Sequence, residues 1–165
     1  MRVRRKCVSA AALTIVLCFT IAPACAAPRV DITNLQDVSL LSLDPFVTAS
    51  RSQSVCVYSN TRTRGYTITA TGSGAASAFT LSGGGLTPVL PYTVAWSAAA
   101  GQSTGATLSP GVALTGLVST ATQKTCRRGP STSASLIVRV TAANLQTAFA
   151  GVRYTGVLTL VIGAE

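Results

Sequence analysis

The side chains of this chain that could do chemistry are chiefly its five cysteines, since the sequence contains no histidine and only four Asp and Glu residues. Three of the cysteines lie within the first 26 residues, at positions 7, 18 and 25, and Cys56 and Cys126 follow much later. If the N-terminal segment is a removable leader, one even pair remains. In an oxidising compartment that pair predicts a single disulfide between Cys56 and Cys126.

Residues 1–26 have the pattern of a secretory signal peptide. Four basic residues between Arg2 and Lys6 precede an apolar run from Val8 to Ala22, and the small residues of Ala24-Cys25-Ala26 suit a cleavage site. A membrane anchor is one alternative, but the run is shorter than the ~20 residues that a spanning helix needs. Lipidation of Cys25 is another, although the aliphatic residue usual three places before such a cysteine is missing. We expect a cleaved signal and an exported domain of residues 27–165.

Signatures of catalysis, metal binding and cofactor binding are missing from the sequence. Without histidine, the chain lacks the usual general base and the commonest metal ligand. The carboxylates of Asp31, Asp37 and Asp44 are close in sequence but form no recognisable glycosidase pair. Lys124, the only lysine after the leader, stands in no Ser-Lys signature. We therefore expect a protein that is not an enzyme, has no cofactor or metal, and does not bind nucleic acid.

The positive charge of the domain admits two interpretations. Thirteen Lys and Arg face four Asp and Glu, but four of the basic residues belong to the leader, so nine against four leaves +5. This charge could favour an acidic partner such as lipopolysaccharide, an acidic glycan or an anionic protein face. Because only Arg62/Arg64 and Arg127/Arg128 cluster in sequence, we favour the second interpretation, scattered arginines that keep an exported protein soluble.

Residues 27–165 alternate between apolar and polar side chains in short runs separated by Gly, Pro and Ser, which is typical of antiparallel strands. One helical turn is expected within 142–150. Seven to nine short strands without an internal repeat predict an all-β, antiparallel β-sandwich in one domain. The expected strands fall within 30–32, 38–40, 55–57, 66–71, 79–81, 92–97, 108–114, 135–140 and 154–162.

Aromatic residues fall mostly on the apolar faces of these strands. They could form a platform on which sugars stack, but their placement favours a buried core. The predicted core aromatics are Tyr66, Phe79, Tyr92, Trp96, Phe149 and Tyr154.

Several segments, read in order, resemble one family. They are Ser54-Val55-Cys56-Val57-Tyr58-Ser59-Asn60, then Tyr66 to Gly72, then Leu90-Pro91-Tyr92-Thr93-Val94-Ala95-Trp96, and finally Phe149 to Leu160 with its Ala-Gly, Tyr, Gly and Leu-Thr-Leu pattern. Together they resemble the spore coat protein U-like domain of archaic chaperone–usher pilus subunits. The resemblance runs over most of residues 30–165 and rests on the order and spacing of these segments.

The resemblance implies an immunoglobulin-like sandwich that is incomplete because its last strand is missing. In this family a periplasmic chaperone first fills the gap, and the N-terminal segment of another pilus subunit later replaces it, by donor-strand exchange. The implied partners are the chaperone, the outer-membrane usher and other subunits, with a host or surface glycan as a further candidate. The implied location is the periplasm and then the cell surface of a Gram-negative bacterium, where the pilus would serve adhesion or biofilm formation.

The strand expected from Tyr154 to Ile162 would then be the acceptor edge, with Tyr154, Leu158, Leu160 and Ile162 on its inner face. A self-complete sandwich, in which this strand pairs with Val30–Leu40, is the alternative. The segment Val30–Leu40 could itself be a donor strand, but Asn34 and Gln36 interrupt its apolar series, so it could equally be the domain's own first strand. A second function therefore stays open, a self-contained exported binding module such as a lectin-like adhesin or envelope-associated protein.

Overall fold

The computed structural model describes residues 27–41 and 43–165, and the predicted signal peptide lies outside them. These residues form mostly strands, with one short 3-10 helix, Ala75–Ser77, and one short α-helix, α1 (Ala142–Leu145). The strands are β1 (Val30–Thr33), β2 (Ala49–Ser59), β3 (Gly65–Gly72), β4 (Thr80–Leu81), β5 (Leu90–Pro91), β6 (Thr93–Ser97), β7 (Ala106–Leu108), β8 (Ala113–Val118), β9 (Ala134–Val140) and β10 (Leu158–Ala164).

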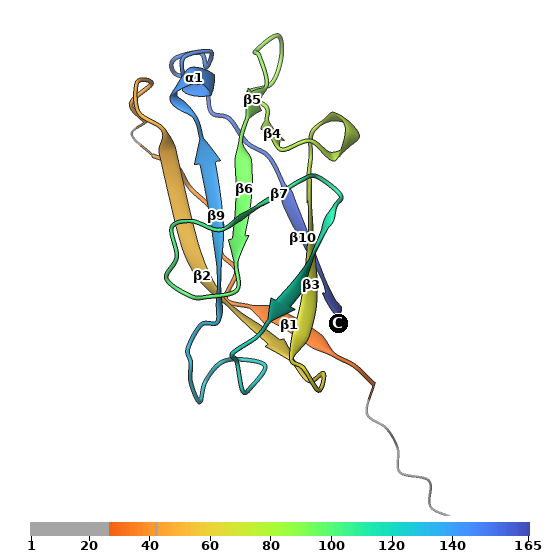
Figure 1. The fold of residues 1–165 in the computed structure, drawn as a ribbon. Helices are drawn as coiled ribbons and strands as arrows, with labels where there is room; N and C mark the ends of the chain where they lie inside the picture. Colours follow the sequence, from red (N-terminus) through yellow and green to blue (C-terminus); the bar gives the residue numbers. More distant parts are fainter. Residues whose placement is uncertain (1–26, 42) are drawn as a thin grey trace, which may run out of the picture.

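Two antiparallel sheets pack against each other (Figure 1). The larger sheet has the strand order β1-β2-β9-β6-β7, and the smaller has the order β10-β3-β8. A short hairpin of β4 and β5 stands at one end of the molecule. The predicted all-β sandwich with antiparallel strands is therefore confirmed.

The core lies between the two sheets because each sheet turns one face of alternating apolar residues inward. In β3, Tyr66, Ile68 and Ala70 are fully buried, as period-two alternation requires of residues that share a face. The indole Nε1 of Trp96, from the larger sheet, donates a hydrogen bond of 3.0 Å to the Tyr66 hydroxyl, from the smaller. Burial raises the pKa of Tyr66 above 10.0, although the bond from Trp96 acts in the opposite direction. This bond joins the sheets across the centre of the core.

Four of the six aromatics predicted for the core are buried there, namely Tyr66, Phe79, Tyr92 and Trp96. The prediction is wrong for Phe149, whose side chain is 55% exposed. Its segment, between α1 and β10, is not a strand, so no alternating face directs the ring inward. Tyr154 is half-buried at the margin of the core.

The predicted disulfide between Cys56 and Cys126 is confirmed. Cys56 lies on the outer face of β2, where it is covered by the loop of residues 119–133 that contains Cys126. Ser133 accepts a hydrogen bond from the Val57 amide at 2.8 Å and donates to the Val57 carbonyl at 2.9 Å. The disulfide and these bonds fix the loop against the larger sheet.

Two local predictions differ from the structure. Residues 38–40 form no strand, although Val38 and Leu40 pack against the core, because their backbone does not join the ladder of a neighbouring strand. The strand residues expected within 108–114 belong to two different strands, because a turn at Pro110-Gly111 connects β7 in the larger sheet to β8 in the smaller. The helical turn expected within 142–150 is α1, whose N-cap Thr141 accepts from the Asn144 amide.

Candidate strand-acceptor seam

β10 is an edge strand of the smaller sheet. It pairs antiparallel with β3 over its whole length, from Leu158 opposite Gly72 to Ala164 opposite Tyr66. Within residues 27–41 and 43–165, no strand pairs with its other side. The outer side of β10 is thus an unpaired row of backbone groups.

The register identifies which backbone groups point outward. The Glu165 amide donates to the Gly65 carbonyl at 3.3 Å, which makes these two residues a hydrogen-bonded pair. Because such pairs alternate along an antiparallel ladder, Gly163, Val161 and Thr159 also direct their amides and carbonyls toward β3. The N–H and C=O groups of Leu158, Leu160 and Ile162 therefore face away from β3, toward the unpaired side.

The side chains of these same residues point into the sandwich but are incompletely covered. Ile162 lies directly opposite Ile68, and Leu160 opposite Ala70. Ile68 and Ala70 are 0% exposed, whereas Ile162 and Leu160 are half-buried. The inner face of the smaller sheet is therefore fully buried at β3 but only partly buried at the neighbouring edge strand β10.

In the larger sheet, the inward-facing side chains of β1, which lies beside β10, are likewise only partly buried. Ile32 in β1 is opposite Val57 in β2, and Val30 is opposite Ser59. Val57 is fully buried, but Ile32 and Val30 are half-buried. We call this line of partly covered apolar residues the β1–β10 seam; it comprises Val30, Ile32, Leu158, Leu160 and Ile162.

The segment after β1 continues along β2 without forming a strand. Asn34 has φ +66°, in the left-handed region, and there the chain leaves the ladder with β2. The Gln53 side chain takes the place of strand pairing, since it accepts from the Gln36 amide at 3.0 Å and donates to the Gln36 carbonyl at 3.1 Å. Val30–Thr33 is therefore the domain's own first strand.

Tyr154 belongs to a different part of the structure from the other three predicted acceptor residues. The strand expected from Tyr154 begins only at Leu158, and Tyr154 lies before it in a connecting segment. Its hydroxyl accepts from the Phe149 amide at 3.0 Å, and the next residue, Thr155, pairs with Ser82 near β4. The prediction that Tyr154 lies on the inner face of the final strand is wrong, because the chain first passes along the β4–β5 hairpin.

The sequence prediction missed β1 as the opposite wall of the seam. Val30 and Ile32 were recognisable as an alternating pair, but their position beside β10 depends on pairing across the whole domain. One end of the seam, where β1 begins and β10 ends, adjoins a cavity of about 400 Å³ lined by Pro28, Asn60, Thr61, Arg62, Thr63, Ala164 and Glu165.

Two other kinds of site are not seen. In the described part of the chain, no three His, Cys, Asp or Glu side chains come together as metal ligands. Nor does any helix there have the length and apolar character to cross a membrane.

No protein-family model matches the chain, and no curated protein of similar sequence was found. The family resemblance thus rests on the residues quoted above. Among solved structures, the fold is similar to that of a chain in a structure described as "Chaperone-tip adhesin complex is vital for synergistic activation of CFA/I fimbriae biogenesis", with a TM-score of 0.52 and 20% identity. The match covers 82% of this chain but 41% of that one, so this chain spans about two fifths of its length. The fold is one that occurs in a component of a fimbrial chaperone–adhesin complex.

Proposed function

We propose that this protein is an exported, non-enzymatic subunit of a chaperone–usher type pilus, assembled by donor-strand exchange and serving adhesion or biofilm formation. It would pass through the periplasm, bound to a chaperone, and reach the cell surface through an outer-membrane usher. In this role the β1–β10 seam accepts a strand from a partner.

The observation that carries the proposal is the coincidence of two features on the same three residues. Leu158, Leu160 and Ile162 expose backbone donors and acceptors along one side of β10, and their side chains are only half-buried. An added strand would satisfy the first feature by main-chain hydrogen bonds and the second by inserting its own alternate side chains. A site for β-strand addition needs both.

The fold comparison and the sequence resemblance support the same function from separate directions. The similar solved chain belongs to a chaperone–tip adhesin complex, and the segments around Cys56, Trp96 and Tyr154 resemble the spore coat protein U-like family. An uncovered apolar edge also promotes aggregation, which gives a physical reason for a dedicated chaperone.

The position of β1 favours an acceptor role for this domain. Because Val30–Thr33 pairs with β2, and Val38 and Leu40 pack on the domain's own core, this stretch is not a free donor strand. A subunit that accepts a strand through this domain without donating these residues fits the tip or a minor position of a filament.

The proposal is tested by giving the domain a strand of its own. An Asn-Gly turn after Glu165, followed by seven residues with Val or Ile at every inward position, would form a hairpin with β10. The control extension has the same turn and length but Thr at the inward positions. Because three apolar side chains are buried only in the first extension, each contributing ~1.5–3 kcal/mol when fully covered and roughly half of that on an edge strand, we expect its free energy of unfolding to exceed the control's by about 3 kcal/mol.

Denaturant unfolding of residues 27–165 with each extension measures this difference. The apolar extension should also keep the domain monomeric at protein concentrations at which the control and the unextended domain begin to self-associate. Equal stability of the two extensions would mean that the seam does not accept a strand, and the proposed assembly mechanism would then be wrong.

A further inference from the structure

Six of the nine basic residues that follow position 26 lie at one end of the sandwich. This end contains the start of β1, the β2–β3 turn and the loop of residues 119–133, whereas α1 and the β4–β5 hairpin lie at the opposite end (Figure 1). All six basic side chains are exposed. We call this set the basic end; it comprises Arg29, Arg62, Arg64, Lys124, Arg127 and Arg128.

Backbone hydrogen bonds hold the β2–β3 turn between the other two segments. On one side, the Asn60 amide donates to the Arg29 carbonyl at 3.0 Å, which joins the turn to the start of β1. On the other side, the Ser119 amide donates to the Arg64 carbonyl at 3.0 Å, which joins it to the start of the loop. Arg29 is thereby held beside the turn that carries Arg62 and Arg64, and the loop of residues 119–133 begins next to the same turn.

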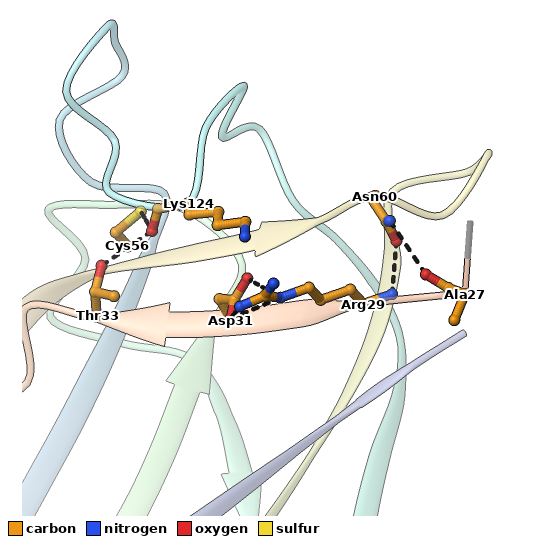
Figure 2. A network of polar contacts seen from close by, with 7 residues as sticks. All are labelled: Ala27, Arg29, Asp31, Thr33, Cys56, Asn60 and Lys124. Atoms are coloured by element: carbon orange, nitrogen blue, oxygen red, sulfur yellow. Dashed lines mark hydrogen bonds and ion pairs between the residues drawn. The ribbon is translucent and has the colours of Figure 1, made fainter.

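The disulfide places the remaining basic residues. Cys126, bonded to Cys56, immediately precedes Arg127 and Arg128. Thr33 donates to the Lys124 carbonyl at 3.3 Å, and Figure 2 shows the Lys124 side chain extending over β2 on the same side as Arg29. The loop that carries these three exposed cations is therefore held against the larger sheet.

Few carboxylates balance this charge. Arg29 forms an ion pair with Asp31, with Nε 2.9 Å from Oδ2, and no other ion pair exists among the described residues. The Glu165 carboxylate accepts from the Gly116 amide at 2.8 Å. Six cations against these two side-chain carboxylates give the basic end a net charge of +4, while the rest of residues 27–165, with Arg51, Arg139, Arg153, Asp37 and Asp44, carries +1.

We propose that the basic end binds a linear acidic polysaccharide. Several exposed cations gathered at one end of a domain, most of them without an ion-pair partner among the described residues, create a potential that attracts a polyanion. A nucleic acid fits this end less well, because the exposed phenylalanines of the described residues, Phe46 and Phe149, belong to the segments just before β2 and just after α1. Thr48 accepts from the first amide of α1, and α1 lies at the opposite end (Figure 1), so these rings are not available for base stacking at the basic end. An anionic membrane also fits less well, since the very exposed Leu86 and Phe46 belong to the β4–β5 hairpin and to the segment before β2, and Figure 1 shows both segments at the opposite end.

This proposal goes beyond the pilus function and does not depend on it. The cations belong to turns and loops outside the β1–β10 seam, so strand exchange can fail while polysaccharide binding holds, and the reverse is equally possible. If both hold, the subunit carries its own attachment surface.

The test compares two double variants of residues 27–165 with equal net charge. Arg62→Gln with Arg128→Gln removes two cations from the basic end, and Arg51→Gln with Arg153→Gln removes two exposed cations from elsewhere. The probe is a heparin oligosaccharide, measured by calorimetry at several salt concentrations. At ~0.2–1 kcal/mol per exposed ion pair, we expect the first variant to bind about fivefold more weakly and with a smaller salt dependence, and the second to bind like the wild type.

Three further outcomes are informative. Equal weakening in both variants would show a response to net charge alone and would overturn the proposal. A 20-base-pair DNA duplex, or vesicles containing phosphatidylglycerol, binding more tightly than heparin would identify the wrong class of partner. If the first variant unfolds at a lower urea concentration than the wild type, a second double variant, Lys124→Gln with Arg127→Gln, repeats the test on the disulfide loop. Weaker heparin binding by this variant supports the proposal, and unchanged binding contradicts it.

Discussion

The half-covered state of β10 can be measured with one pair of residues that the structure matches closely. Ile68 in β3 and Ile162 in β10 are directly opposite each other, have the same side chain and face the same core. They differ in cover, since Ile68 is 0% exposed and Ile162 is half-buried. Ile68→Ala and Ile162→Ala therefore delete the same atoms from two degrees of burial.

The expected magnitudes follow from that difference. Truncating a fully buried isoleucine to alanine typically costs about 2–5 kcal/mol, because transfer free energy is lost and a cavity is left. Ile68→Ala should lie in that range. Ile162→Ala should cost roughly half as much in the isolated domain, since solvent or a small shift of the edge strand can fill the space it leaves.

The assay is urea unfolding of residues 27–165 with the disulfide intact, alone and with the apolar strand appended after Glu165. In the extended protein, the cost of Ile162→Ala should rise toward that of Ile68→Ala, which should itself change little. If Ile162→Ala costs as much as Ile68→Ala in the isolated domain, the seam is already sealed and the acceptor role cannot stand.

Three further predictions concern the core and the loop. Tyr66→Phe should lower the free energy of unfolding by about 1–3 kcal/mol, because the buried Trp96 Nε1–H loses its acceptor. Denaturant unfolding measures this loss, and Trp96→Phe, which removes the donor of the same bond, is the matched variant. Burial raises the pKa of Tyr66, so the unfolded chain releases the tyrosine proton at a lower pH than the folded chain, and the free energy of unfolding should fall as pH rises above about 10. This fall should be smaller in Tyr66→Phe. An identical pH profile in both proteins would contradict the raised pKa of Tyr66. Replacing Cys56 and Cys126 by Ser should cost about 4 kcal/mol through the unfolded chain, given the separation of 70 residues, and a loss below 1 kcal/mol would show that the loop is held without the disulfide.

The sequence contained enough information for the architecture because local alternation determines it. The run from Tyr66 to Thr71 and the run around Trp96 each bury one face, and both are strands of the sandwich. The disulfide was predictable for a different reason, since only one pair of cysteines follows the predicted leader.

The errors arose where long-range contacts override local pattern. Tyr154 shares the phase of Leu158 and Leu160, yet Thr155 pairs with Ser82 and the Val157 amide donates to Ser73, so the strand begins later. These partners lie more than 70 positions upstream, so the alternation of apolar and polar residues near Tyr154 does not predict them. Val38 and Leu40 alternate as a strand would, but the Gln53 side chain occupies the hydrogen-bonding position near them.

The basic end was likewise invisible in sequence. Arg62 and Arg64 are far along the chain from Arg127 and Arg128, so the charges looked scattered. The Ser119–Arg64 hydrogen bond and the disulfide help bring the turn and the loop to the same end. Which charged side chains share a surface depends on how the strands are connected in space, and the spacing of residues along the chain does not predict this.

Amide hydrogen exchange along β10 tests the open edge most directly. In residues 27–165 alone, the amides of Leu160 and Ile162, which face away from β3, should exchange rapidly, and those of Val161 and Gly163, which bond to β3, should be protected. Appending the apolar strand should protect Leu160 and Ile162 as well, whereas the Thr-containing control should not. Protection of Leu160 and Ile162 in the isolated monomeric domain would contradict the account, because another strand would then already occupy the seam.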